Sequence, residues 1–101
     1  MTVYVIATHD KVLDHSGYET YKKLAVESIT KFNGRLITRA KETKVISGNW
    51  SPERIVIIEF SCAEDALLWS ESAEYKKACS VSDVTAINRK QIMILDSEDL
   101  Q

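Results

Sequence analysis

The sequence contains only three glycines, one proline, two cysteines and two histidines in 101 residues. It has no Gly-rich phosphate loop, so a nucleotide-binding site of that kind is not expected. Cys62 and Cys79 form no CxxC pair and are not spaced from His9 or His15 as metal ligands usually are. We therefore expect no metal and no bound cofactor.

The chain also lacks any apolar run approaching the roughly 20 residues that span a bilayer. Its first residues carry no positively charged segment of the kind that begins a signal peptide. Basic residues are scattered, and no basic run interleaved with aromatics is present, so nucleic acid is not an expected partner. Two lone thiols without a secretion signal indicate a protein of the reducing cytoplasm.

The length predicts one domain over residues 1–101, with an acidic tail at 96–101 that frays. The apolar, β-branched run at residues 54–60 predicts a strand covered on both faces, interrupted only by Glu59. Residues 2–8, 35–47 and 91–95 predict three more strands, the second one irregular near residues 40–43. The turn cluster at 48–52 joins two of these strands in a hairpin.

Two helices are predicted between the strands. Apolar residues recur at three- and four-residue steps from Tyr18 to Phe32, after a capping box formed by Ser16 and Glu19. The second helix begins after residue 61, and Ser72 is predicted to cap a further short helix running to Ala78. Residues 82–90 are consistent with either a loop or one helical turn.

The order β-α-β-β-α-β predicts an α+β fold of the ferredoxin-like class, with an antiparallel sheet in the strand order 4-1-3-2. Two helices cover only one face of such a sheet, yet several of its strands are apolar on both faces. The second face therefore requires another cover. A second copy of the chain would supply it in a homodimer, and the alternative is a monomer with an exposed ligand-binding face.

The sequence also resembles a known family along nearly its whole length. The residues that carry this resemblance are Val3-Tyr-Val-Ile6, Asp14…Tyr18…Tyr21, Asn33-Gly34-Arg35, Arg39, Gly48-Asn-Trp-Ser-Pro52, Arg54-Ile-Val-Ile-Ile-Glu-Phe60, and the run Ala66…Trp69…Ser72-Ala-Glu-Tyr75. They are similar to the small bacterial proteins catalogued as domain of unknown function 1330, in the dimeric α/β-barrel superfamily. The resemblance implies a ferredoxin-like fold and a face-to-face homodimer, and it implies no established activity.

The chain departs from the family pattern at several positions. It has Asn33-Gly34 where the family has Gly-Gly, Arg39-Ala40-Lys41 where it has Arg-Gly-Gly, and Ser72-Ala where it has Ser-Pro. An arginine that follows the family's tyrosine is replaced near Ser82. If that arginine binds an anion in relatives, this protein binds something else or nothing.

Glu59 is the candidate catalytic residue. Strand alternation places it with Ile55 and Ile57 on the face that meets the second sheet, where an apolar surrounding would raise its pKa and favour a general base. A hairpin pairing through residue 47 brings it opposite Lys41 with Arg39 diagonal. Glu59 is thus either an acid/base or a structural ion pair, and Arg39 either binds an anionic ligand or pairs with Glu59.

Four aromatic or heteroaromatic residues are candidate ligand-binding residues. Trp69 and Tyr75, at helical spacing, belong either to the core or to the lining of a pocket. Trp50, in the hairpin loop, either covers a partner subunit or closes the mouth of a cavity. His9 is expected at the same sheet edge as Trp50, either as an acid or base or as an ordinary surface histidine.

Two functional hypotheses follow for a homodimer with a small cavity between sheet and helices. The first is a cofactor-independent enzyme that acts on a small polar or anionic molecule, with Glu59 as acid/base and Arg39 orienting the substrate. The second is a non-catalytic ligand-binding or accessory module in which both residues are structural. The sequence alone does not identify the ligand or the reaction.

Overall fold

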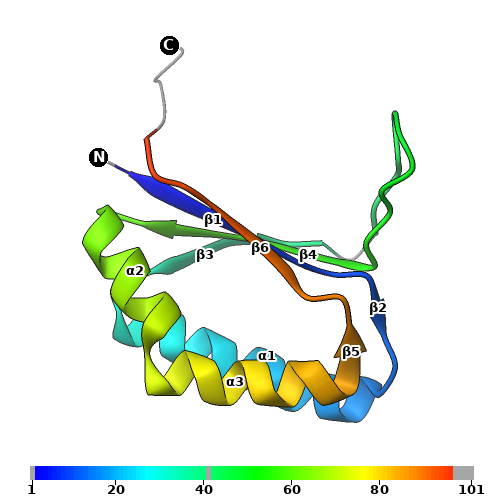
Figure 1. Cartoon of the computed structure of the whole chain (residues 1–101), viewed down its shortest axis with the longest axis horizontal. Helices are drawn as coiled ribbons and strands as arrows, with labels where there is room; N and C mark the ends of the chain where they lie inside the picture. The colour runs from blue at the N-terminus through cyan, green and yellow to red at the C-terminus, as the bar shows by residue number, and fades with distance from the viewer. Residues whose placement is uncertain (1, 41, 97–101) are drawn as a thin grey trace.

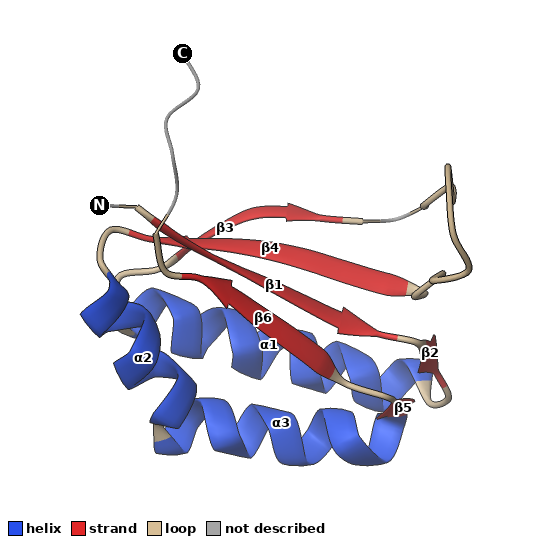
Figure 2. Ribbon diagram, turned by 45° about the horizontal axis from the view of Figure 1, so that its top comes forward, coloured by secondary structure: helices blue, strands red, loops and turns tan. Residues whose placement is uncertain are grey.

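A computed structural model describes residues 2–40 and 42–96. The long strands are β1 (Val3–His9), β3 (Arg35–Arg39), β4 (Arg54–Phe60) and β6 (Lys90–Ile94), and the helices are α1 (His15–Lys31), α2 (Ala63–Glu71) and α3 (Ala73–Thr85). Two very short strands, β2 (Lys11–Val12) and β5 (Ala86–Ile87), pair with each other beside the main sheet. All three helices lie on one side of the sheet (Figures 1 and 2).

The antiparallel sheet has the order β3-β4-β1-β6. If the four long strands are numbered in chain order, this is the predicted order 4-1-3-2 read from the other edge. The α+β, ferredoxin-like class is therefore confirmed. The short β2–β5 ladder is the difference from the predicted arrangement, and it lies where the chain enters α1 and leaves α3.

Helix α1 begins two residues earlier than the predicted capping box. Its N-cap is Asp14, whose carboxylate accepts a hydrogen bond from the Gly17 amide at 3.0 Å, so Ser16 already lies inside the helix. The helix ends where Asn33 adopts a positive φ of 64°. Gly34 follows because a Cβ there would lie 2.6 Å from Cε1 of Phe60.

The second predicted strand is shorter than expected. It ends at Arg39, and the irregularity lies between Leu36 and Thr38 instead of near residues 40–43. Residues 42–53 form a long loop that extends away from the sheet on the side opposite the helices (Figure 1). Helix α3 is longer than predicted and runs to Thr85, so residues 82–85 are helical. Its cap is as predicted, because the Ser72 hydroxyl accepts from the Tyr75 amide at 3.1 Å.

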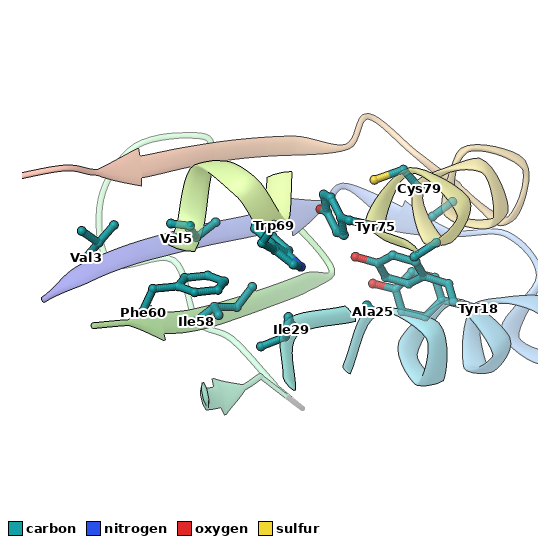
Figure 3. Packing of buried hydrophobic residues seen from close by; sticks show 14 of the residues in the cluster. Val3, Val5, Tyr18, Ala25, Ile29, Ile58, Phe60, Trp69, Tyr75 and Cys79 are labelled. Atoms are coloured by element: carbon teal, nitrogen blue, oxygen red, sulfur yellow. The ribbon is translucent and has the colours of Figure 1, made fainter. Parts of the chain in front are cut away.

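The core lies between the sheet and the helices (Figure 3). Side chains alternate along each strand, and Val3, Val5, Ile58 and Phe60 face the helices and are almost fully buried. Trp69 of α2 packs on Phe60, with ring centroids 5.3 Å apart. This packing anchors α2, while α1 and α3 lie side by side (Figure 2).

The opposite face of the sheet is apolar and no described helix lies on it (Figures 1 and 2). Among the described residues the 42–53 loop reaches only part of this face, where Trp50 lies near Ile6 and Thr8. Tyr4, Ile6, Ile55 and Ile57 are half-buried there, and Ile92 is 65% exposed. We call this surface the outer face, and the helix-covered surface the inner face. A row of half-buried and exposed isoleucines across three strands is unusual for a monomer in water. The expected fraying of residues 96–101 concerns a segment of which 97–101 lie outside the described residues.

Candidate functional site

A narrow cavity of about 30 Å³ lies between the inner face and helix α1. Its walls are mainly aliphatic and aromatic. The polar side chains of its lining that reach solvent are Lys22, Arg39 and Arg54, so these residues mark its mouth. The complete lining is Ala7, Tyr18, Tyr21, Lys22, Ala25, Val26, Ile29, Leu36, Arg39, Arg54, Val56, Ile58, Trp69 and Tyr75.

Two arginines reach the cavity from neighbouring strands. Arg39 is the last residue of β3 and pairs in register with Val56, which faces inward. Arg54 is the first residue of β4, and its guanidinium carbon lies 5.8 Å from the centre of the Tyr18 ring, in cation–π range. Neither guanidinium forms an ion pair with a carboxylate of the described residues. Lys22, the third cation at the mouth, is paired with Glu19 at 2.8 Å. The mouth therefore carries two positive charges that are available to a ligand.

Tyrosines form the inner wall of the cavity, and Trp69 lies beside them (Figure 3). The Tyr18 and Tyr21 ring centroids are 5.1 Å apart, and those of Trp69 and Tyr75 are 4.0 Å apart. The Trp69 indole N–H donates to Ser28 at 3.0 Å, which fixes the indole ring. The Tyr75 hydroxyl is buried without a hydrogen-bond partner among the described residues.

All three phenols are neutral at neutral pH, and burial raises their pKa values further above it. Burial raises the pKa of Tyr18 to about 12, against a smaller opposing effect of the nearby Arg54 charge. It also raises the pKa values of Tyr21 and Tyr75. The wall therefore offers uncharged hydroxyl groups beside the two charged arginines.

His9 lies behind Tyr18 and is only 2% exposed. Its Nδ1 is 2.8 Å from the Tyr18 hydroxyl, and its ring meets Tyr18 and Tyr21 edge-on. Burial, followed by the charge of Arg89, lowers the pKa of His9 to about 4. The expectation of a surface histidine is wrong, because His9 continues the inward alternation of Val5 and Ala7 past the apolar part of β1.

The shared sheet edge had suggested that Trp50 and His9 are neighbours, but the structure separates them. Trp50 lies in the 42–53 loop, is 54% exposed, and faces an open depression together with Asp10, Asn49, Ser51 and Lys90. It also borders a smaller depression over outer-face residues of β1 and β6. Trp50 and His9 are separated because one belongs to the outer side of the sheet and the other to the inner face.

The predicted ion pair of Glu59 with Arg39 is wrong, and the alternative pair with Lys41 falls on a residue outside the described ones. The register places Glu59 opposite Arg35, and Arg35 Nη2 lies 3.1 Å from Glu59 Oε1. The bulge between Leu36 and Thr38 shifts the pairing, and Lys41 lies outside the described residues. Glu59 lies on the outer face, as predicted, whereas the cavity lies on the inner face. Its role as an acid or base stays a prediction.

The described residues contain no group of three or more His, Cys, Asp or Glu side chains that could hold a metal ion. Cys62 and Cys79 are free thiols. Burial raises the pKa of Cys79, so its thiol keeps its proton at neutral pH. Across residues 2–40 and 42–96, no helix is both long and apolar enough to cross a bilayer.

Residues 2–96 match the family model described as Domain of unknown function (DUF1330). The chain belongs to this family. No curated protein matches the sequence. The family description assigns no activity, so any function must come from the site and from proteins of similar fold.

Three solved structures illustrate the fold likeness. A protein of unknown function from Rhodopseudomonas palustris aligns with a TM-score of 0.74 at 8% identity, over 97% of this chain and 84% of its own. A dimeric protein of unknown function with a ferredoxin-like fold from Bacteroides fragilis aligns with a TM-score of 0.59 at 14% identity, over 94% of this chain and 96% of its own. SnoaB, a cofactor-independent oxygenase from Streptomyces nogalater, aligns with a TM-score of 0.58 at 8% identity, over 98% of this chain and 94% of its own. Such low identities establish the fold of this DUF1330 member and nothing about its chemistry.

The structure brings together three of the predicted ligand-binding residues, Arg39, Trp69 and Tyr75, around one cavity. Sequence reasoning missed Arg54 and Tyr18. The period-two alternation contains the signal for Arg54, because the inward series Phe60, Ile58 and Val56 continues to it. Tyr18 stands on the apolar stripe of α1, and no sequence pattern indicates that its hydroxyl meets a histidine.

Proposed function

We propose that this DUF1330 protein binds a small molecule with an apolar body and an anionic end in the cavity beneath the sheet. The observation that carries the proposal is the pair of guanidinium groups, Arg39 and Arg54, at the mouth of a cavity with apolar and aromatic walls. Neither forms an ion pair with a carboxylate of the described residues. Small-molecule sites combine such walls with a few convergent polar groups. Arginine is suited to carboxylates because its planar fork donates two parallel hydrogen bonds.

The cavity must widen to admit such a ligand. About 30 Å³ is room for only about two water molecules, each of which needs roughly 10–15 Å³ by this measure. The side chains at the mouth can provide the space, since Lys22 and Arg39 are long, flexible and partly solvent-exposed. The deeper walls are held by Trp69, whose indole is fixed by Ser28. Opening is therefore expected at the edge formed by α1 and β3.

An enzyme without a bound cofactor is the more specific version of this proposal. It is supported by the similarity in fold to the cofactor-independent oxygenase and by protonated hydroxyls beside two cations, an arrangement that can stabilise a negative charge developing on a substrate. In this version the cavity residues carry the chemistry, and Glu59 on the outer face has no direct access to the ligand. The alternative is a binding or accessory module that uses the same cavity without turnover.

Binding can be tested with benzoate, which joins an apolar ring to a carboxylate, and with benzyl alcohol as its neutral counterpart. A Trp50→Phe background leaves Trp69, in the cavity wall, as the fluorescent reporter. We expect benzoate to bind more tightly than benzyl alcohol, and Arg39→Gln or Arg54→Gln to weaken benzoate binding at least about tenfold. Arg35→Gln, on the outer face, is the matched control and should bind normally. Equal binding of the two probes, or none, would contradict the proposal.

We also propose that the protein is a homodimer in which two outer faces pack together. The proposal is supported by the uncovered isoleucines of that face and by the similarity in fold to the dimeric Bacteroides protein. Ile92→Glu should give a monomer in sedimentation experiments. Val84→Glu alters an equally apolar, 78% exposed side chain on α3 and should leave the dimer intact. A wild-type protein that sediments as a monomer would refute this assembly.

Native mass spectrometry of the purified protein can separate the enzyme from the binding module as a first step. It reports the number of subunits and the mass of any small molecule retained in the cavity. A retained molecule that is consumed on incubation with the protein would favour the enzyme. A retained molecule that persists unchanged would favour the module.

A further inference from the structure

We propose that His9 fixes the orientation of the Tyr18 hydroxyl so that Tyr18 acts as a hydrogen-bond donor to an anionic oxygen of the ligand. This proposal rests on the proposed anion binding in the cavity and extends it. The site would then consist of two cations and one neutral donor, and its ligand class would be molecules with charge concentrated on oxygen, such as carboxylates and enolates. His9 is a positioning residue in this arrangement, because it does not line the cavity.

The first support is the single hydrogen bond between the two residues. His9 Nδ1 and the Tyr18 hydroxyl oxygen are 2.8 Å apart, and both side chains are almost fully buried. Either the imidazole donates to the phenol oxygen or the phenol donates to the imidazole. In the first case the Tyr18 proton remains available to another acceptor, and in the second it is consumed by His9.

The second support is the other imidazole nitrogen. His9 Nε2 is buried and has no hydrogen-bond partner among the described residues. A neutral imidazole carries one proton, so placing it on Nε2 would leave a buried N–H group unpaired. Unpaired buried N–H groups are rarer in proteins than acceptors with unused capacity. With the proton on Nδ1, the donor left unpaired among the described residues is instead the hydroxyl of Tyr18, a residue that lines the cavity, where water or a ligand can accept its proton. His9 does not line the cavity, so a proton on Nε2 would have no such acceptor. The geometry therefore favours the proton on Nδ1, with Nδ1–H donating to the Tyr18 oxygen.

The third support is that neither group changes its charge near neutral pH. The pKa of His9 is lowered to about 4 and that of Tyr18 is raised to about 12, in both cases mainly by burial. The imidazole ring is also held between the edges of Tyr18 and Tyr21, with interplanar angles of 88° and 86°. If a neutral, rigid His9 donates its Nδ1 proton to the Tyr18 oxygen, the phenolic proton of Tyr18 remains free to donate a hydrogen bond to a ligand.

That proton can serve a ligand in the cavity. Tyr18 lines the cavity, and its ring extends from α1 toward the interior (Figure 3). The Arg54 guanidinium lies over the same ring, 5.8 Å from its centre, so a donor and a cation belong to the same part of the site. Donors fixed in advance around a developing negative charge stabilise it without reorganisation. The same arrangement would favour an enolate over the corresponding ketone.

The proton position can be tested without any ligand. Protein labelled with ¹⁵N-histidine is studied by two-dimensional NMR at pH 7, and His15→Gln assigns the signals of the two histidines. We expect Nδ1 of His9 to be protonated and Nε2 to be bare. A proton on Nε2 would overturn the proposal. This outcome does not depend on whether benzoate binds, so it is independent of the proposed function.

The donor role can be tested by benzoate titration of three variants. Tyr18→Phe removes the donor and should weaken binding at least about tenfold. His9→Asn keeps an N–H group near the position of Nδ1 and should bind within a few-fold of wild type, whereas His9→Leu should resemble Tyr18→Phe. Equal weakening by both His9 variants would indicate a merely structural role and overturn the proposal.

Two further outcomes keep the proposals separate. Unchanged benzoate binding in Tyr18→Phe would overturn the donor role while leaving anion binding intact. Absence of benzoate binding in the wild-type protein would overturn the proposed function, and the NMR result would then stand alone. Should His9→Leu fail to fold, as judged by circular dichroism, Tyr18→Phe and the proton position still decide the question.

Discussion

Acid should destabilise the fold through His9, and the size of the effect can be worked out. The pKa of this histidine falls from 6.5 to about 4 on folding, mainly because the ring is buried and next because of the Arg89 charge. Asp83 and Asp10 act in the opposite direction but do not compensate. Between pH 6.5 and 4 the unfolded chain binds a proton at His9 that the folded protein does not. Stability is therefore complete above about pH 6.5 and is lost as the pH falls.

The difference of about 2.5 pKa units corresponds to roughly 3 kcal/mol of folding free energy, a large share of the stability of a domain this size. Because carboxylates also titrate in this range, the contribution of His9 is isolated by comparison with His9→Asn. This variant keeps a hydrogen-bond donor for Tyr18 but cannot be protonated.

The assay is urea denaturation followed by tryptophan fluorescence at pH 7, 6, 5 and 4. The protein concentration is held constant because a dimer's stability depends on it. We expect wild type to lose roughly 3 kcal/mol more than His9→Asn between pH 7 and pH 4. Parallel losses in the two proteins would refute the reasoning, since they would mean that His9 is hydrated or already paired with an acid when folded.

Three substitutions test the packing and the ion pair by urea denaturation at pH 7. Gly34→Ala should cost about 1–3 kcal/mol, because the new methyl group overlaps the Phe60 ring, and an unchanged midpoint would contradict the close approach. Ser28→Ala should cost about 1–3 kcal/mol by leaving the Trp69 N–H unpaired, and a neutral result would indicate another acceptor. Glu59→Gln should cost less than about 1 kcal/mol if its pair with Arg35 lies outside the contact between subunits, since Arg35 is 71% exposed in the single subunit, and a larger loss would indicate a pair buried between two outer faces.

Much of the fold can be predicted from hydrophobic periodicity. The strand at residues 54–60, the helix after Tyr18 and the Ser72 cap all have local signals that tertiary packing reinforces. The length of α3 could not be predicted in this way. Its last turn contains Ser82 and Thr85, which are weak helix formers, and it persists because it packs against α1 with Ser82 fully buried.

The candidate site was only partly predictable. Arg39, Trp69 and Tyr75 lie at the cavity, as the sequence had suggested. The partner of Glu59 depends on a bulge in β3, and no residue type in that strand predicts the position of the bulge. The pairing of His9 with a tyrosine from α1 depends on how a strand end meets a helix in space. Sequence spacing carries no information about such a contact, and the polarity of histidine suggested the surface instead.

The alternation of side chains in β4 has a consequence for how this protein can diverge. Arg54, Val56 and Ile58 face the cavity, while Ile55, Ile57 and Glu59 face outward. A substitution therefore alters one surface and spares the other. Loss or gain of a single residue within the strand would exchange the two sets and damage both surfaces at once. Changes in chain length should accordingly accumulate in the 42–53 loop, while β4 varies only by replacement.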